Sequence, residues 1–290
     1  MDKITGTGVA LITPFNEDFS IDFTSLKKLI NHQIEGGVDY LVVMGTTGES
    51  VVLSKSEKKE VVNFCKKINA GRLPIILGLG SNNTFALVEE IKSTDFDGID
   101  GVLSVSPYYN KPTQDGIYLH YKMIAEVCPL PIILYNVPGR TASNITAETT
   151  LCLANDFDNI VAVKEASGDL QQIAEIIEKR PANFLVLSGD DGLTPKMIEM
   201  GGDGVITVIG QSHPQIFSDM VRAGLAGDFE KANQLHDKLN PIYEPLYIDG
   251  NPAGIKATLN IMGICKNVLR PPLVGVTEKT YNNLKRFIEH

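Results

Sequence analysis

The sequence has no tryptophan, few cysteines and no recognisable set of metal ligands. Its cysteines are scattered, without the paired spacing of zinc sites or redox motifs, so we expect free and mostly buried thiols. The five histidines include no metalloprotease-type pair on one helix face. We therefore predict that no metal takes part in the chemistry. The cysteines are Cys65, Cys128, Cys152 and Cys265.

Long apolar runs and an excess of basic charge are also absent. No segment approaches the ~18 continuous apolar residues that suggest a membrane span. The N-terminal residues 1–6 show no apolar run of the signal-peptide type. A formal net charge of −9 argues against nucleic acid or an anionic membrane as a partner. We expect a cytoplasmic protein in which a local positive site would meet any anionic substrate.

What the chain does contain is a repeated alternation of short apolar runs with longer amphipathic stretches. Eight such runs begin roughly 20 to 34 residues apart, which suits one strand and one helix per repeat. This count predicts a closed (β/α)8 TIM barrel. An open, doubly wound sheet is the alternative, but Gly78–Asn83 matches its dinucleotide fingerprint only weakly. The runs are Val9–Ile12, Tyr40–Met44, Pro74–Gly78, Gly101–Val105, Pro131–Tyr135, Ile160–Val163, Phe184–Leu187 and Gly204–Val208.

The strand pattern stops after the eighth run. From about Gln215 onward the sequence is typical of helices, which we expect to break at Pro241, Pro245, Pro252 and the Pro271-Pro272 pair. This is more helix than a barrel needs to close. We therefore predict a catalytic barrel over residues 1–225 and a C-terminal helical region over residues 226–290.

Lys164 is the main candidate for chemistry, because it ends the apolar run that begins at Ile160. Burial disfavours the charged form of an amine, and a neutral lysine attacks carbonyls to form Schiff bases. The alternative is a lysine that extends to solvent or pairs with Glu165 or Asp169. Only the residues at the other strand ends can decide between these interpretations.

In a barrel of this type, the residues that follow the strands form the active site. Residues 45–50, Gly-Thr-Thr-Gly-Glu-Ser, could bind a small carboxylate through backbone N–H groups and hydroxyls, or could simply cap the next helix. Tyr135 could pass protons to a substrate oxygen, and Arg140 could hold a substrate carboxylate. Tyr135 could equally be an ordinary rim residue and Arg140 a solvated charge. For Asp190 and Asp191 we favour a role at a helix start.

Five motifs at successive strand ends resemble the dihydrodipicolinate synthase family, which belongs to the pyruvate-dependent class I aldolases. The resemblance spans essentially the whole chain, in order. One such motif would be weak evidence, whereas five together are highly specific. The motifs lie at residues 45–50, 107–112 (Pro-Tyr-Tyr-Asn-Lys-Pro), 135–141 (Tyr-Asn-Val-Pro-Gly-Arg-Thr), 163–170 and 188–191.

The resemblance implies condensation of pyruvate with aspartate semialdehyde, the first committed step toward diaminopimelate and lysine, without a cofactor. It identifies Lys164 as the Schiff-base lysine. The proton relay would be Tyr135, Thr46 and Tyr109, the last reaching in from a neighbouring subunit of a homotetramer. The remaining substrate-binding residues would be Thr47 for the pyruvate carboxylate, Arg140 for the aldehyde carboxylate, and Gly189 and Ile206 lining the lysine pocket.

Two other functions stay open. The superfamily includes N-acetylneuraminate lyase and other sugar-acid aldolases, which share the lysine and the tyrosine. A pyruvate-binding regulator without catalysis is a second alternative. Lysine-inhibited members carry histidines and a glutamate at an effector pocket, where this chain has Lys55, Lys58 and Ala86. Two cations without a carboxylate suit an ammonium group poorly, so we predict weak or absent inhibition by lysine.

Overall fold

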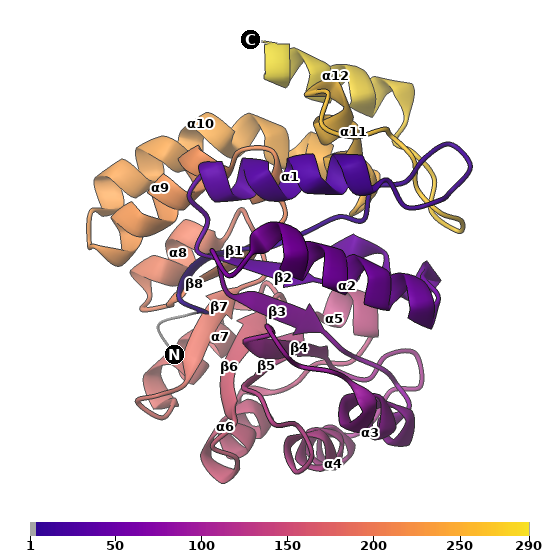
Figure 1. Cartoon of the computed structure of the whole chain (residues 1–290). Helices are drawn as coiled ribbons and strands as arrows, with labels where there is room; N and C mark the ends of the chain where they lie inside the picture. Colours follow the sequence, from indigo (N-terminus) through magenta and orange to yellow (C-terminus); the bar gives the residue numbers. More distant parts are fainter. Residues whose placement is uncertain (1–3, 290) are drawn as a thin grey trace.

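Eight short buried runs pair side by side in chain order and close into a barrel of parallel strands (Figure 1). The computed structural model describes residues 4–289; residues 1–3 and His290, which the two predicted regions include, lie outside the described part. The predicted (β/α)8 barrel is confirmed, and the open sheet is excluded because β1 pairs with β8. The strands are β1 Gly6–Ala10, β2 Tyr40–Val43, β3 Ile75–Gly78, β4 Gly101–Val105, β5 Ile132–Asn136, β6 Ile160–Glu165, β7 Leu185–Ser188 and β8 Gly204–Thr207.

Side chains along the strands alternate between two hydrophobic clusters, except at Val161 and Ala162 of β6, which both belong to the cluster inside the barrel. Tyr40 and Ile133 belong to a cluster made almost entirely of strand residues, which fills the barrel. Their neighbours Leu41 and Ile132 belong to a larger cluster that includes residues of the surrounding helices. Both faces of every strand are therefore buried, which explains why the strands appear in the sequence as continuous apolar runs.

The first strand begins earlier than the sequence indicates. We predicted Val9–Ile12, whereas β1 runs from Gly6 to Ala10. Gly6 and Gly8 conceal the strand because glycine has low strand propensity. Gly8 is required by packing, since a Cβ atom there would lie 2.0 Å from the ring of Tyr40.

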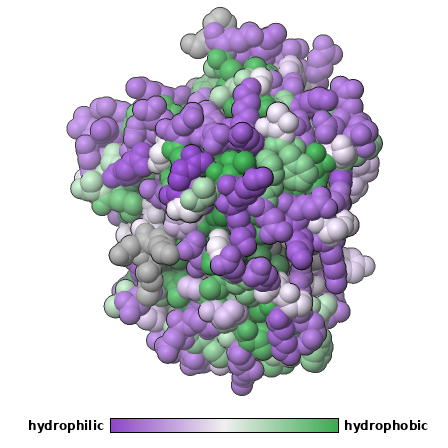
Figure 2. All heavy atoms as spheres, viewed as in Figure 1, coloured by the Kyte–Doolittle hydropathy of each residue, from purple (hydrophilic) through white to green (hydrophobic). Residues whose placement is uncertain are grey.

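Helices surround the barrel, and the face in Figure 2 is mainly hydrophilic with scattered hydrophobic residues. Among residues 4–289, no helix is both long enough and apolar enough to span a membrane. The α-helices are α1 Phe23–Glu35, α2 Lys55–Asn69, α3 Thr84–Ser93, α4 Gln114–Ala125, α5 Pro138–Thr141, α6 Ala147–Asp156, α7 Leu170–Lys179, α8 Thr194–Glu199, α9 Pro214–Leu225, α10 Phe229–Tyr247, α11 Ala253–Ile261 and α12 Glu278–Glu289. Short 3-10 helices are η2 Thr46–Gly48, η3 Ser50–Val52 and η4 Ile209–Gln211.

The C-terminal helices α10, α11 and α12 gather at one side of the barrel beside α9 and α1 (Figure 1). The predicted breaks at Pro241 and Pro245 are wrong, because α10 continues through both. A proline inside a helix costs about 3 kcal/mol or more. Leu239, Ile242 and Leu246 are buried on the same helix, and this packing offsets that cost. The division at residue 225 stays a prediction.

Candidate active site

Lys164 and Tyr135 lie side by side at the carboxyl ends of β6 and β5, where they are paired in the sheet register. The Lys164 side chain is buried, with 5% of the residue exposed, and its Nζ lies 4.4 Å from the centroid of the Tyr135 ring. Within residues 4–289, no carboxylate forms an ion pair with Lys164. The alternative interpretations, a lysine in solvent or one paired with Glu165 or Asp169, are therefore wrong. A buried amine without an anionic partner suits Schiff-base chemistry.

Two neighbours shape the space around the lysine chain. A Cβ atom at Gly189 would lie 2.6 Å from the Cβ of Ala166 and 3.1 Å from the Cε of Lys164, so a side chain here would clash with Ala166 and crowd the lysine. Ile206 on β8 is buried in the same barrel-filling cluster as Tyr135. Gly189 thus lies against Lys164, and Ile206 lies in the same cluster as Tyr135; their role as pocket residues stays a prediction.

The carboxylate of Glu165, the residue next to Lys164, is bound by other groups and forms no ion pair with the lysine. Its side chain accepts hydrogen bonds from Asn136 Nδ2, from Gln172 Nε2 at 3.0 Å and from the Ser167 backbone N–H at 2.8 Å. Burial raises the pKa of the Glu165 carboxyl, while these donors oppose that rise. Since adjacent strand residues point to opposite faces, this network ties β6 to β5 and α7 and leaves Lys164 in the barrel.

The Gly-Thr-Thr-Gly-Glu-Ser segment forms η2 and the start of η3 after β2. Thr46 is exposed, whereas the hydroxyl of buried Thr47 accepts a hydrogen bond from Asn251 Nδ2 at 2.9 Å. The idea that this segment caps the next helix is wrong, because α2 is capped by Ser54 in a capping box with Glu57. The Thr46 hydroxyl is therefore free of any capping role, as a carboxylate-binding turn requires.

Arg140 and Tyr109 lie further out. Arg140 is exposed on α5 and donates a hydrogen bond from Nη2 to the backbone oxygen of Asn251 at 3.2 Å. Tyr109 is 89% exposed and has a positive φ of 70°, an uncommon conformation for tyrosine. Within this chain it does not line the pocket described next, whereas its neighbour Tyr108 does.

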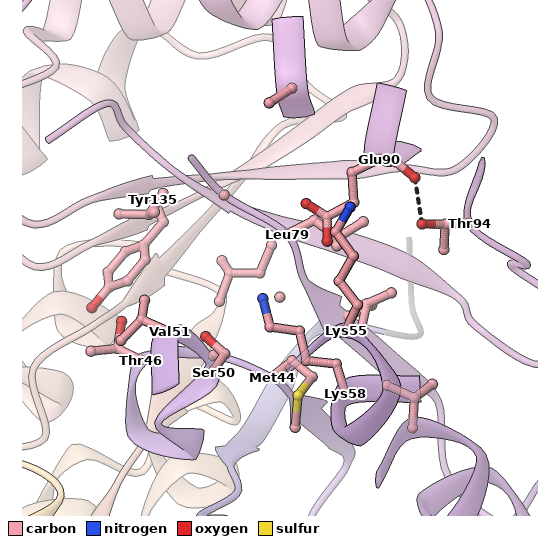
Figure 3. A pocket seen from close by; sticks show the side chains of 18 of the residues that line it. Met44, Thr46, Ser50, Val51, Lys55, Lys58, Leu79, Glu90, Thr94 and Tyr135 are labelled. Carbon is pink, nitrogen blue, oxygen red and sulfur yellow. Dashed lines mark hydrogen bonds between the residues drawn. The ribbon is translucent and has the colours of Figure 1, made fainter. Parts of the chain in front are cut away.

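A cavity of about 860 Å³ opens beside these residues. It is lined by Thr46, Tyr135 and Arg140 at the barrel and continues between α2 and α3. In Figure 3, Tyr135 and Thr46 lie at one end, while Lys55, Lys58 and Glu90 lie further along. Its lining residues do not include Lys164, Thr47, Tyr109, Gly189 or Ile206.

The outer half of this cavity contains the three positions predicted for an effector pocket, Lys55, Lys58 and Ala86. We expected this pocket to carry two cations and no carboxylate. That holds for the three predicted positions but not for the whole pocket, because Glu89 and Glu90 of α3 also line this half. Glu89 already pairs with Lys92 at 3.0 Å. The three positions chosen from the sequence motifs therefore do not account for all the charged side chains that line the cavity.

Sequence patterns assigned one of the two adjacent aspartates correctly. Asp190 accepts hydrogen bonds from the backbone N–H groups of Gly192 and Leu193 just before α8, as predicted for a helix start. Asp191 was assigned wrongly. Its buried carboxylate accepts from the N–H groups of Val208 and Ile209 and from the Tyr247 hydroxyl, so it fixes the loop after β8.

Comparisons with known proteins agree on one family. A sequence model of the dihydrodipicolinate synthetase family matches residues 3–290. The 4-hydroxy-tetrahydrodipicolinate synthases of Flavobacterium psychrophilum and Parabacteroides distasonis are 52% and 51% identical, over 99% of this chain and 98% and 96% of theirs. The crystal structure of dihydrodipicolinate synthase from Thermotoga maritima superposes with a TM-score of 0.96 at 39% identity, covering 99% of this chain and 98% of that one. With the match extending from the first strand to the last helix, this chain belongs to the dihydrodipicolinate synthetase family.

Proposed function

We propose that this chain condenses pyruvate with L-aspartate 4-semialdehyde to 4-hydroxy-tetrahydrodipicolinate through a Schiff base on Lys164. The observation that carries the proposal is a buried lysine in contact with a tyrosine at the carboxyl ends of the barrel strands, with no ion pair to any carboxylate of the described residues 4–289. Family membership and the synthases at about half identity support the choice of reaction. Formation of 4-hydroxy-tetrahydrodipicolinate is a step of the diaminopimelate route to lysine.

The proposed reaction begins when the Lys164 amine attacks the keto carbon of pyruvate and water leaves. The resulting iminium withdraws electrons from the adjacent methyl group, which loses a proton and becomes an enamine. The enamine carbon then attacks the aldehyde carbon of the semialdehyde. The amino group of the bound semialdehyde displaces Lys164 from the former keto carbon, the ring closes, and the free lysine returns. Because the iminium is the electron sink, this route calls for no further cofactor.

The other residues bind carboxylates and move protons. Tyr135 lies against Lys164 and is placed to exchange protons with the substrate oxygen, with Thr46 as the next member of the relay. The Thr46-Thr47 turn binds the pyruvate carboxylate through its N–H groups and hydroxyls. Arg140, which lines the cavity, pairs with the carboxylate of the aldehyde.

Tyr109 completes the relay only if it comes from a second subunit. Its 89% exposure and its absence from the lining of its own cavity support a role across an interface. We propose a homotetramer built as a dimer of dimers, on the basis of the family resemblance. The cytoplasmic location stays a prediction.

The test is turnover with the purified enzyme, in which product is identified by mass spectrometry. We expect product from pyruvate and aspartate semialdehyde, and none when either substrate is omitted. A set of sugar aldehydes with pyruvate serves as the matched comparison. Turnover of a sugar aldehyde in preference to the semialdehyde would identify a sugar-acid aldolase, and binding of pyruvate without turnover of any aldehyde would identify a regulator.

A further inference from the structure

The turn that faces the substrate is held between two residues in strained backbone conformations. Met44, just before the turn, has a φ of 63°, and Glu49, just after it, has a φ of 53°. Left-handed conformations cost free energy for residues other than glycine and persist when the surrounding structure enforces them. The surroundings of Glu49 therefore decide whether Thr46 and Thr47 keep their arrangement.

Glu49 extends away from the cavity into the C-terminal helical region. One of its carboxylate oxygens lies 2.5 Å from Nζ of Lys256 on α11, and the side chains are 1% and 0% exposed. The other oxygen accepts a hydrogen bond from the backbone N–H of Arg270 at 3.1 Å. Both oxygens are thus fixed by groups more than 200 residues away along the chain.

Lys256 is equally constrained. Its Nζ donates a hydrogen bond to the backbone oxygen of Val268 at 2.8 Å and lies 4.1 Å from the centroid of the Phe15 ring. The same region reaches the turn a second time, through the hydrogen bond from Asn251 to the Thr47 hydroxyl. Two separate contacts from around α11 therefore converge on the back of the substrate-facing turn.

A buried ion pair is a poor way to stabilise a fold, because removing two charges from water can cost more than their attraction returns. A gain in stability is therefore a weak explanation for this pair. What the pair provides is a fixed direction for the Glu49 side chain, and so for the backbone of the turn that Glu49 ends. This contrasts with Lys179 and Glu175 on α7, which form an exposed pair within a single helix.

We propose that Glu49 and Lys256 are positioning residues that hold the Thr46-Thr47 turn in the conformation that binds the substrate carboxylate. The proposal rests on the proposed function, since it presumes that pyruvate binds at this turn. It gives the C-terminal region a role in substrate binding that is separate from its packing on the barrel.

The experiment measures capture of pyruvate on Lys164 by borohydride reduction, as a function of pyruvate concentration, in Glu49→Gln and in Glu49→Gln/Lys256→Met. The double variant removes both charges, so it leaves no unpaired buried charge. Glu175→Gln/Lys179→Met is the matched control. We expect the half-saturating pyruvate concentration to rise about tenfold or more in the double variant, equivalent to ~1.4 kcal/mol of binding, and to stay unchanged in the control.

A second readout separates positioning from general damage. Acetone has the same reacting carbonyl but no carboxylate, so its capture should be equal in the double variant and the wild type. A well-folded double variant that captures pyruvate like the wild type would overturn the proposal. So would equal loss of acetone and pyruvate capture, or failure of both variants to fold, because the pair would then serve the fold. If the wild type itself captures no pyruvate, the proposed function fails instead.

Discussion

Lys164 and Lys256 are both buried lysines that lie over an aromatic ring, yet their surroundings differ. Lys164 lies near the carboxyl end of β6, has no carboxylate paired with it within residues 4–289, and lies beside Tyr135, which lines the open cavity. Lys256 sits on a C-terminal helix and has an ion pair, a backbone acceptor and no exposed surface. Burial alone therefore does not mark a reactive lysine. The partners also matter, because an amine engaged by a carboxylate and a carbonyl oxygen is not free to attack a carbonyl carbon.

The same contrast separates the two regions of the molecule. The barrel carries the reactive groups at its strand ends. The C-terminal region contacts the turn after β2 through Lys256 and Asn251, on the side away from the cavity. Substitutions in the first region should change chemistry at little cost in stability. Substitutions in the second should change substrate affinity or stability without touching the reacting atoms.

The largest effect is expected for Lys164→Ala, which removes the nucleophile. Turnover and covalent capture of pyruvate should both fall below detection, while the melting temperature stays close to that of the wild type. Lys196→Ala, which removes an exposed lysine paired with Glu199, is the control and should behave like the wild type. Substantial residual turnover in Lys164→Ala would remove this lysine from its assigned role.

Tyr135→Phe tests whether the ring beside Lys164 acts through its hydroxyl. A positioned acid or base contributes about 10²- to 10⁴-fold to rate, so kcat should fall within that range. Tyr118→Phe is the matched control, since the Tyr118 hydroxyl bonds to Asp156 near the surface. A kcat within twofold of the wild type would mean that Tyr135 lines the site without transferring protons.

Arg140→Ala should separate the two substrates. Loss of a hydrogen bond to a charged group costs about 1.5–3 kcal/mol, which corresponds to roughly 10- to 150-fold in kcat/KM for the semialdehyde. Capture of pyruvate should remain near the wild-type level, and Arg140→Lys should recover part of the aldehyde activity. Equal loss in both half-reactions would indicate a structural role, through the hydrogen bond to Asn251.

Glu57→Gln probes the C-terminal contact in a way that depends on pH. The hydrogen bonds from Arg270 lower the pKa of the Glu57 carboxyl from 4.5 to about 2. A carboxyl with a lowered folded-state pKa stabilises the fold above the unfolded value, and this contribution disappears as the pH falls toward about 2. The wild type should therefore melt higher than Glu57→Gln at neutral pH, and the difference should shrink below about pH 4.5. A pH-independent difference would contradict this.

The smallest expected effect is that of free lysine. Lys55 and Lys58 face the outer half of the cavity, so initial rates at micromolar lysine should match those without it. The carboxylates of Glu89 and Glu90 work against this expectation. Inhibition at micromolar lysine would show that they, rather than the two cations, determine what binds there.

The sequence predicted the barrel and the strand-end residues because both leave local signals. A strand buried on both faces is a continuous apolar run, and Lys164, Tyr135 and Thr46 each follow or end such a run. β1 was misplaced because it contains glycines, one of which, Gly8, leaves space for Tyr40 of another strand. The breaks predicted at Pro241 and Pro245 failed because burial of the surrounding α10 residues outweighs the local cost of proline.

The residues that support the site left no such signal. Asn251, Lys256 and Arg270 lie in loops and a helix far along the chain, and their role depends on contacts across about 200 residues. Asp191 was assigned wrongly for the same reason, since its partners lie on η4 and α10. The spacing of residues within one segment of the sequence cannot reveal a hydrogen-bond or ion-pair partner that lies in a distant segment.

The most direct measurement is peptide mass spectrometry after borohydride reduction of the wild-type protein, with and without pyruvate. The account predicts one pyruvate-dependent adduct, on the peptide that contains Lys164, and none on the peptide that contains Lys256. No adduct on a folded sample, or an adduct on a different lysine, would contradict the central claim that Lys164 is the reactive amine of this site.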